Sequence, residues 1–159
     1  MVKPVTAVDV ESDPLFLLYD VARLIRLRAD QRARLMDMTR AQWVILAWLE
    51  LRPGISQTEL AELVDVEPIT VARLVDRLES RGLVERRHDP SDRRVRRLHV
   101  LDAAEPVLTE IRAYRADVND RVAKQLGPKT LQTLTRSLRS IKEELARDPL
   151  VSGNSEKPA

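Results

Sequence analysis

The sequence predicts a mainly α-helical fold of six helices with one small two-stranded β-hairpin. Only four of the 159 residues are glycine, and Ala, Leu and Arg dominate, a composition that favours helices. Two capping boxes, at Thr39 to Gln42 and Ser56 to Glu59, mark helix starts. A single stretch rich in turn residues, 88–93, separates two strand-like runs and predicts the hairpin.

Composition excludes several classes of function. Cysteine is absent, which excludes disulfides and thiolate metal sites, and two histidines are too few for a His-only metal cluster. The sequence shows no nucleophile–base pair and no phosphate-binding loop, so we expect no catalytic residue, metal or cofactor. No apolar run approaches the roughly 20 residues that span a bilayer. We expect a cytoplasmic globular protein with no membrane partner.

The first helix is predicted from Pro14 to about Leu35, because Asp13-Pro14 reads as an N-cap followed by the first helical residue. Its apolar stripe includes Leu17 and Val21. Residues 41–51 form a second helix that is apolar nearly all round, which is typical of a buried helix.

Two short helices follow in quick succession. Ser56 caps residues 57–64, and Pro68 starts a helix that runs to about Arg81, where Gly82 ends it. Two short helices joined by a tight turn after a buried helix indicate a helix-turn-helix. Residues 83–87 and 94–101 read as the strands of a hairpin beside the second helix. We expect only the C-terminal half of the second strand to be packed.

The last two helices are predicted on either side of Gly127-Pro128. The final one carries apolar residues spaced 3, 4, 3 and 4 apart, a heptad stripe made of Leu131, Leu134, Leu138, Ile141 and Leu145. The helix before it carries a looser stripe that includes Leu108 and Ile111. We expect the N- and C-terminal helices to form a homodimer interface; the alternative is that these stripes pack inside one protomer.

A helical wheel divides residues 69–81 into two faces. Apolar side chains gather on one side, whereas Thr70, Arg73, Arg77 and Ser80 lie opposite, with Ile69 at the edge. A helix of this size fits the DNA major groove, where Arg can bind guanine bidentately and Thr can contact a base. The alternative is a solvated face whose arginines pair with Asp76 and Glu79.

The hairpin carries six arginines between residues 86 and 97, against three acids from Glu85 onward. Crowded like charges repel, and DNA phosphates relieve that repulsion. A narrow minor groove also attracts an inserted arginine. We expect Asp92 to brace a neighbouring arginine while Arg93 or Arg94 points outward. The alternative is a hairpin that is merely soluble and arginine-rich.

These motifs resemble the MarR family of bacterial winged helix-turn-helix transcriptional regulators. The resemblance covers residues 13–147 and is most specific in RLVDRLESRGLVERRHDPSDRR. It implies a homodimer that binds a pseudo-palindromic operator, usually as a repressor. It also implies release from DNA by a small aromatic or anionic effector, whose identity the sequence does not give.

The resemblance implies five regions. We expect a disordered N-terminus at 1–12, a dimerisation helix at 13–36, a DNA-binding lobe at 37–101, dimerisation helices 5 and 6 at 102–147, and a flexible tail at 148–159. The residues that we predict to contact double-stranded DNA are Ser56, Gln57, Pro68, Thr70, Arg73, Arg77, Arg86, Asp92, Arg93, Arg94 and Arg96.

The dimer contacts and the effector site are also assigned by residue. The predicted dimer contacts are Leu17, Val21, Leu108, Ile111, Leu131, Leu134, Leu138 and Ile141. An effector pocket would use Arg23, Arg26 and Trp43, although surface ion pairs for the arginines and core packing for Trp43 are the simpler interpretation. The alternative function is a winged-helix protein-interaction module whose basic hairpin meets an acidic partner.

Overall fold

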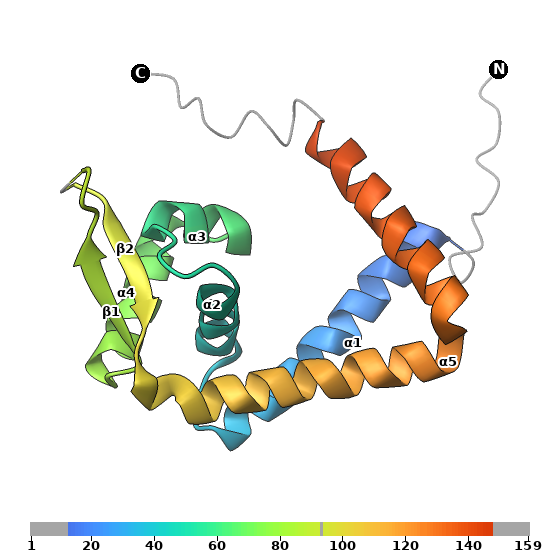
Figure 1. The fold of residues 1–159 in the computed structure, drawn as a ribbon, viewed down its shortest axis with the longest axis horizontal. Coiled ribbons are helices and arrows are strands. Elements are labelled where there is room, and N and C mark those ends of the chain that lie inside the picture. The colour runs from blue at the N-terminus through green and yellow to red at the C-terminus, as the bar shows by residue number, and fades with distance from the viewer. Residues whose placement is uncertain (1–12, 93, 148–159) are drawn as a thin grey trace, which may run out of the picture. The chain divides into compact units, whose positions relative to one another are not determined.

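The computed structural model of the protein describes residues 13–92 and 94–147 (Figure 1). The regions 1–12 and 148–159, for which we predicted disorder, and Arg93 lie outside the described residues. The chain forms two compact units that divide between Tyr114 and Arg115. The structure is mainly helical with one antiparallel hairpin, so the predicted fold class is confirmed.

Helix α1 spans Pro14–Leu35, as predicted. The Asp13 side chain caps it by accepting a hydrogen bond from the backbone N–H of Leu15 at 2.8 Å. Ala29 and Ala33 are its only buried residues, whereas most of its large apolar side chains are exposed, among them Leu15, Phe16, Leu17, Leu18, Tyr19, Val21, Leu24 and Ile25. The first unit therefore leaves much of the apolar surface of α1 uncovered.

The next three helices begin where their capping residues predict. Helix α2 spans Arg40–Leu51 and α3 spans Gln57–Val64, and both have complete capping boxes. Helix α4 spans Pro68–Ser80 and starts on its proline. The core of this unit is apolar and includes the fully buried side chains Ile45, Leu46, Leu49, Leu60, Val71, Val75, Leu78, Val84 and Leu98.

The hairpin pairs β1 (Val84–His88) with β2 (Arg96–Val100). Leu98 in the C-terminal half of β2 is fully buried, as expected. On the other edge of β2, the backbone of Leu98 bonds to Gly54 and Ile55, and Ser56 forms an isolated bridge with Arg97. The segment that leads into α3 therefore acts as a short third strand and fixes the hairpin beside α3.

A 3₁₀ turn, Asp102–Ala104, leads into α5, which spans Glu105–Ala146. We predicted two helices here, and the structure has one element with a break. Gly127 has φ 72° and ψ 163°, which are not helical angles, and Pro128 follows it. Glycine reaches this φ without strain, so the break lies where the sequence places it. The described residues therefore form five α-helices rather than the predicted six.

The N-terminal part of α5 belongs to the core of the first unit. Leu108 is 8% exposed and Ile111 is 1% exposed, so both are buried within one protomer. Both side chains therefore have little surface left for a partner, so we do not propose them as dimer contacts. Tyr114 lies on the same face, and its ring meets Trp43 edge-on at 6.4 Å between centroids.

The second unit keeps its apolar stripe partly exposed. Leu134, Leu138 and Ile141 are each exposed by 37–40%, while Leu131 is half-buried. None of the described helices has an apolar stretch long enough to cross a membrane.

Candidate nucleic-acid interface

Helix α4 has two chemically distinct faces. Val71, Val75 and Leu78 are fully buried against the core. Thr70, Arg73, Arg77 and Ser80 are all exposed on the opposite side, and Pro68 and Ile69 are exposed at its start. The division predicted from the helical wheel is confirmed. The exposed face offers solvent hydroxyl groups and two guanidinium groups.

The two arginines of this face are not paired with carboxylates. Within residues 13–92 and 94–147, neither Arg73 nor Arg77 forms an ion pair. The acids that could have paired with them are engaged elsewhere, since Asp76 and Glu79 both bind Arg86. The alternative, in which the arginines on the exposed face of α4 pair with Asp76 and Glu79, is therefore not observed.

Arg86 has a different place from the one predicted. Its side chain is only 18% exposed, and its guanidinium lies 2.7 Å from the Asp76 carboxylate. It also donates to Glu79, to the Ala72 carbonyl at 3.1 Å and to the Gln57 side chain at 3.2 Å. These bonds hold the guanidinium between α3 and α4. We therefore withdraw Arg86 from the predicted DNA contacts.

The start of α3 is also committed to internal bonds. The Ser56 hydroxyl accepts from the backbone N–H of Glu59, and Ser56 is only 9% exposed. The Gln57 side-chain oxygen accepts from Arg86. Ser56 is thus a capping residue, and we withdraw it as a base or phosphate contact, whereas Gln57 bridges α3 to β1 through its oxygen and stays a predicted contact.

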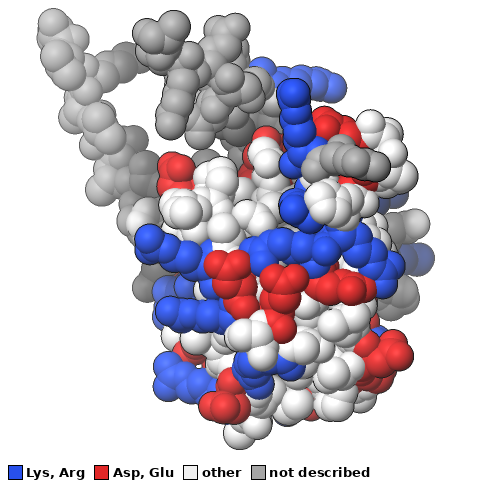
Figure 2. Space-filling model, turned by 90° about the vertical axis from the view of Figure 1, so that its left-hand side faces the viewer, with Lys and Arg blue, Asp and Glu red and all other residues white. Residues whose placement is uncertain are grey.

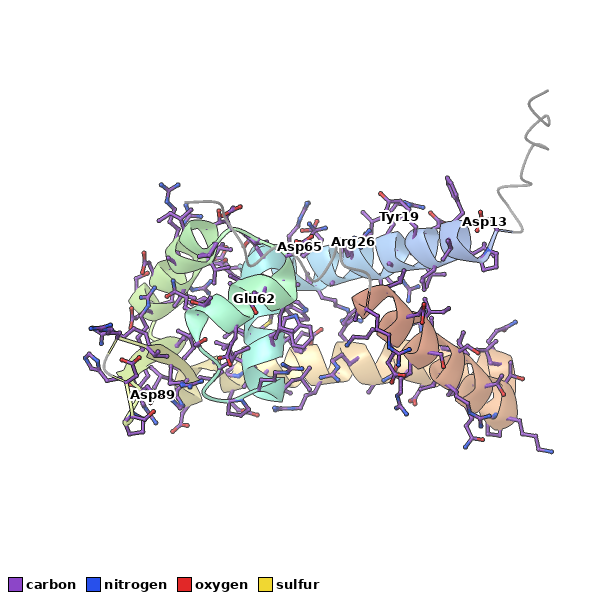
Figure 3. The ribbon with its side chains drawn as sticks, turned by 90° about the horizontal axis from the view of Figure 1, so that it is seen from above. Asp13, Tyr19, Arg26, Glu62, Asp65 and Asp89 are labelled. Atoms are coloured by element: carbon purple, nitrogen blue, oxygen red, sulfur yellow. The ribbon has the colours of Figure 1, made fainter. Side chains whose placement is uncertain are left out.

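The hairpin tip is organised by Asp89, which we did not single out from the sequence (Figure 3). Its carboxylate accepts from the backbone N–H of Ser91 at 2.7 Å, from the Ser91 hydroxyl and from the Asp92 N–H at 3.1 Å. On its other side it accepts from Arg97 Nε at 2.7 Å. The sequence signal was available, because Asp before Pro-Ser is a typical Asx turn.

These bonds change the ionisation of Asp89. The Ser91 hydroxyl, the Arg97 guanidinium and the Ser91 N–H hold the pKa of the Asp89 carboxyl well below its usual value. In return, the hydrogen bond to Asp89 raises the pKa of Arg97. Each bond favours the charged form of its partner, so the pair stays ionised at neutral pH.

Among the described residues, Asp92 forms no ion pair with an arginine side chain; Arg93, one of the neighbours that we expected it to brace, lies outside them. Its carboxylate accepts from the backbone N–H of Arg94 at 2.9 Å. This bond turns the backbone at the tip but leaves the Arg94 guanidinium without an ion pair in the described part of the chain. Within the described residues, a carboxylate and a guanidinium of the hairpin are paired in this way at Asp89 and Arg97.

The remaining arginines of the hairpin differ in their partners and in their exposure to solvent. Arg87 pairs with Glu85, and the Arg96 guanidinium lies 2.7 Å from His88 Nε2. Arg94 and Arg96 are both exposed, and Arg93 lies outside the described residues. On the side of the molecule that bears the hairpin, basic and acidic side chains lie close together rather than in separate fields (Figure 2). The interface is therefore defined by particular unpaired arginines and not by bulk charge.

The three residues predicted for an effector pocket lie in different environments. Arg23 pairs with Asp20, and both Arg23 and Arg26 are exposed on α1. Arg26 lies over the ring of Tyr19 at 5.9 Å (Figure 3). Trp43 is 3% exposed and packs in the core. The simpler interpretation fits Arg23 and Trp43, whereas Arg26 contacts an aromatic ring and forms no ion pair with the described residues.

Comparisons with known proteins place the chain in a family. The model of the MarR family matches residues 38–95, which run from the turn before α2 through the hairpin tip. The transcriptional regulator PA3341 is 32% identical over 81% of this chain and 95% of that one, with a TM-score of 0.74. A crystal structure of MarR is 28% identical over 85% of this chain and 92% of that one, with a TM-score of 0.71.

A third structure shares the fold at lower identity. The complex of S. aureus MepR with DNA is 19% identical over 85% of this chain and 98% of that chain, with a TM-score of 0.72. The family model, the similarity to PA3341 and the helical fold with its hairpin agree with one another. The protein belongs to the MarR family of transcriptional regulators.

Proposed function

We propose that the protein binds double-stranded DNA sequence-specifically as a homodimer and represses transcription from a pseudo-palindromic operator. The observation that carries the proposal is the exposed face of α4, where Arg73 and Arg77 lie beside Thr70 and pair with no carboxylate of the described residues. Free guanidinium groups on an exposed helix can bind guanine O6 and N7 in the major groove.

The hairpin supports the same proposal with a second contact. Arg94 and Arg96 are exposed on a tip that is held in shape by Asp89. An arginine on such a tip can enter an adjacent minor groove or bind phosphates. Helix α4 would supply sequence preference, and the hairpin would supply affinity and orientation. MepR, which shares the fold, has been crystallised with DNA.

The homodimer is proposed from uncovered apolar surface. Helix α1 leaves Leu17 and Val21 about half exposed, and Leu134, Leu138 and Ile141 form an exposed stripe in the second unit. Exposed apolar stripes of this kind mark protein interfaces. Two copies of α4 on a two-fold axis could read half-sites about 34 Å apart. Regulation by a small aromatic or anionic effector stays a prediction from the family.

Selection of bound sequences from random duplex DNA tests the proposal. We expect a pseudo-palindromic consensus, bound at least about a thousandfold more tightly than random duplex. We also expect log affinity to fall linearly as log salt concentration rises. Weak and equal binding to every duplex would contradict the proposal and favour a protein-interaction module with an acidic partner.

A further inference from the structure

Arg86, in β1, bonds to α3 and to a pair of acids on α4, the proposed recognition helix. The residue lies in β1, where strand alternation puts it on the same face as the fully buried Val84. Its guanidinium therefore points at α4 rather than at solvent. It meets Asp76 and Glu79, and it also donates to the Ala72 carbonyl.

The acids lie where they could interfere with DNA binding. Asp76 is 62% exposed and Glu79 is 40% exposed, both on the helix that carries Arg73 and Arg77. Asp76 is three residues beyond Arg73, a spacing at which oppositely charged side chains pair along a helix. Without another partner, Asp76 would compete with a base for Arg73, and both carboxylates would repel phosphates.

We propose that Arg86 is a positioning residue that neutralises Asp76 and Glu79, so that Arg73 and Arg77 stay free to bind DNA. Arg86 itself would not touch DNA, because its side chain is largely buried and all its bonds are internal. This inference rests on the proposed function. It goes further by assigning a role in DNA affinity to a residue behind the binding surface.

A double-mutant cycle tests the inference. The four proteins are the wild type, Arg86→Gln, Asp76→Asn/Glu79→Gln, and the triple variant, with Kd measured on the selected operator. We expect Arg86→Gln to bind about tenfold more weakly, because two uncompensated carboxylates then face the DNA. In the Asp76→Asn/Glu79→Gln protein, adding Arg86→Gln should change Kd by no more than about twofold to threefold.

A matched control separates this effect from lost stability. Arg112 also binds two carboxylates, those of Glu50 and Glu105, but none of the three lies on α4. Arg112→Gln also removes a guanidinium that binds two carboxylates, and its Kd for the operator should not change. The melting temperatures of both variants report how much stability each one loses.

The outcomes separate neutralisation of the two acids by Arg86 from a direct contact between Arg86 and DNA. An equal loss of affinity from Arg86→Gln in both backgrounds would overturn the inference, since Arg86 would then act on DNA directly. No loss in either background would overturn it as well. If Arg86→Gln alone does not fold, the triple variant decides: near wild-type affinity supports neutralisation, and a large loss refutes it. Absence of selective binding by the wild type would instead refute the proposed function.

Discussion

Asp89 and Arg97 form an ion pair at 2.7 Å that joins the tip of the hairpin to its second strand. The Asp89 side chain is only 9% exposed, although it lies at a loop. Arg97 also donates to the Gly54 carbonyl at 3.2 Å and approaches Glu59 at 3.3 Å. The pair therefore links the shape of the tip to the start of α3, and through it to the helix-turn-helix.

Asp89→Asn should weaken operator binding by about threefold to tenfold. The amide can still accept from the Ser91 N–H, but it loses the charge that holds Arg97. The tip would then need to be ordered upon binding, which reduces affinity. Fluorescence anisotropy with labelled operator would measure the change.

Glu85→Gln is the matched control for this substitution. It removes the same charge from the same hairpin, at a carboxylate that pairs with the exposed Arg87. Exposed pairs of this type contribute little to structure. We expect the Glu85 variant to bind the operator at least as well as the wild type. Similar losses in both variants would show that total charge matters and that the tip geometry does not.

The stability that Asp89 provides should depend on pH. Its pKa in the folded protein lies below that in the unfolded chain, which is about 3.9 for an aspartate. The unfolded state then binds more protons in acid, so the contribution is complete above about pH 4 and is lost as the pH falls further. The difference in the free energy of unfolding between the wild type and Asp89→Asn should shrink below about pH 4. Urea titrations across this range would measure it, and a constant difference would refute the assignment.

Local sequence signals predicted most of the fold. Asp13, Thr39 and Ser56 cap the helices that they were expected to cap, because a cap is read from three or four adjacent residues. The two faces of α4 follow from helical periodicity in the same way. The break at Gly127 also lies where glycine followed by proline indicates.

Local sequence signals could not predict which groups the arginines bind. Arg86 binds acids that lie seven and ten positions earlier in the chain, and charge alone does not say which arginine faces inward. Strand alternation gave a signal, since Arg86 is two residues after the buried Val84. The burial of Ile111 likewise depends on which face of α5 meets α2. An apolar stripe on a helix predicts that the stripe is buried, but not whether the core or a dimer interface buries it.

Arg73→Ala and Arg94→Ala should have different effects on DNA binding. Loss of Arg73 should cost about 1–3 kcal/mol on the operator and relax the preference at one base position. Loss of Arg94 should weaken all duplexes alike and reduce the salt slope by about one. Titrations of operator and random duplex at several salt concentrations would separate the two. Arg81→Ala is the control, because that guanidinium bonds to the Asp37 carbonyl.

Ile111→Ala should lower stability without changing the oligomeric state. Its side chain is 1% exposed in the core of one protomer, and removing buried methyl groups costs about 2–5 kcal/mol. Chemical unfolding would measure the loss, and sedimentation would report the mass. A change of mass with little loss of stability would restore Ile111 to the dimer interface.

Leu138→Asp should yield monomers that bind the operator poorly. Leu138 is 37% exposed and lies in the apolar stripe of the second unit, so a carboxylate there would be buried without a partner in a dimer. A monomer has one recognition helix and reads one half-site, which reduces affinity steeply. Leu51→Asp is the matched control, since Leu51 is 53% exposed on α2 and lies outside the stripes. Light scattering should give a halved mass for the Leu138 variant and the wild-type mass for the control. A wild-type mass for both would mean that another surface holds the two copies together.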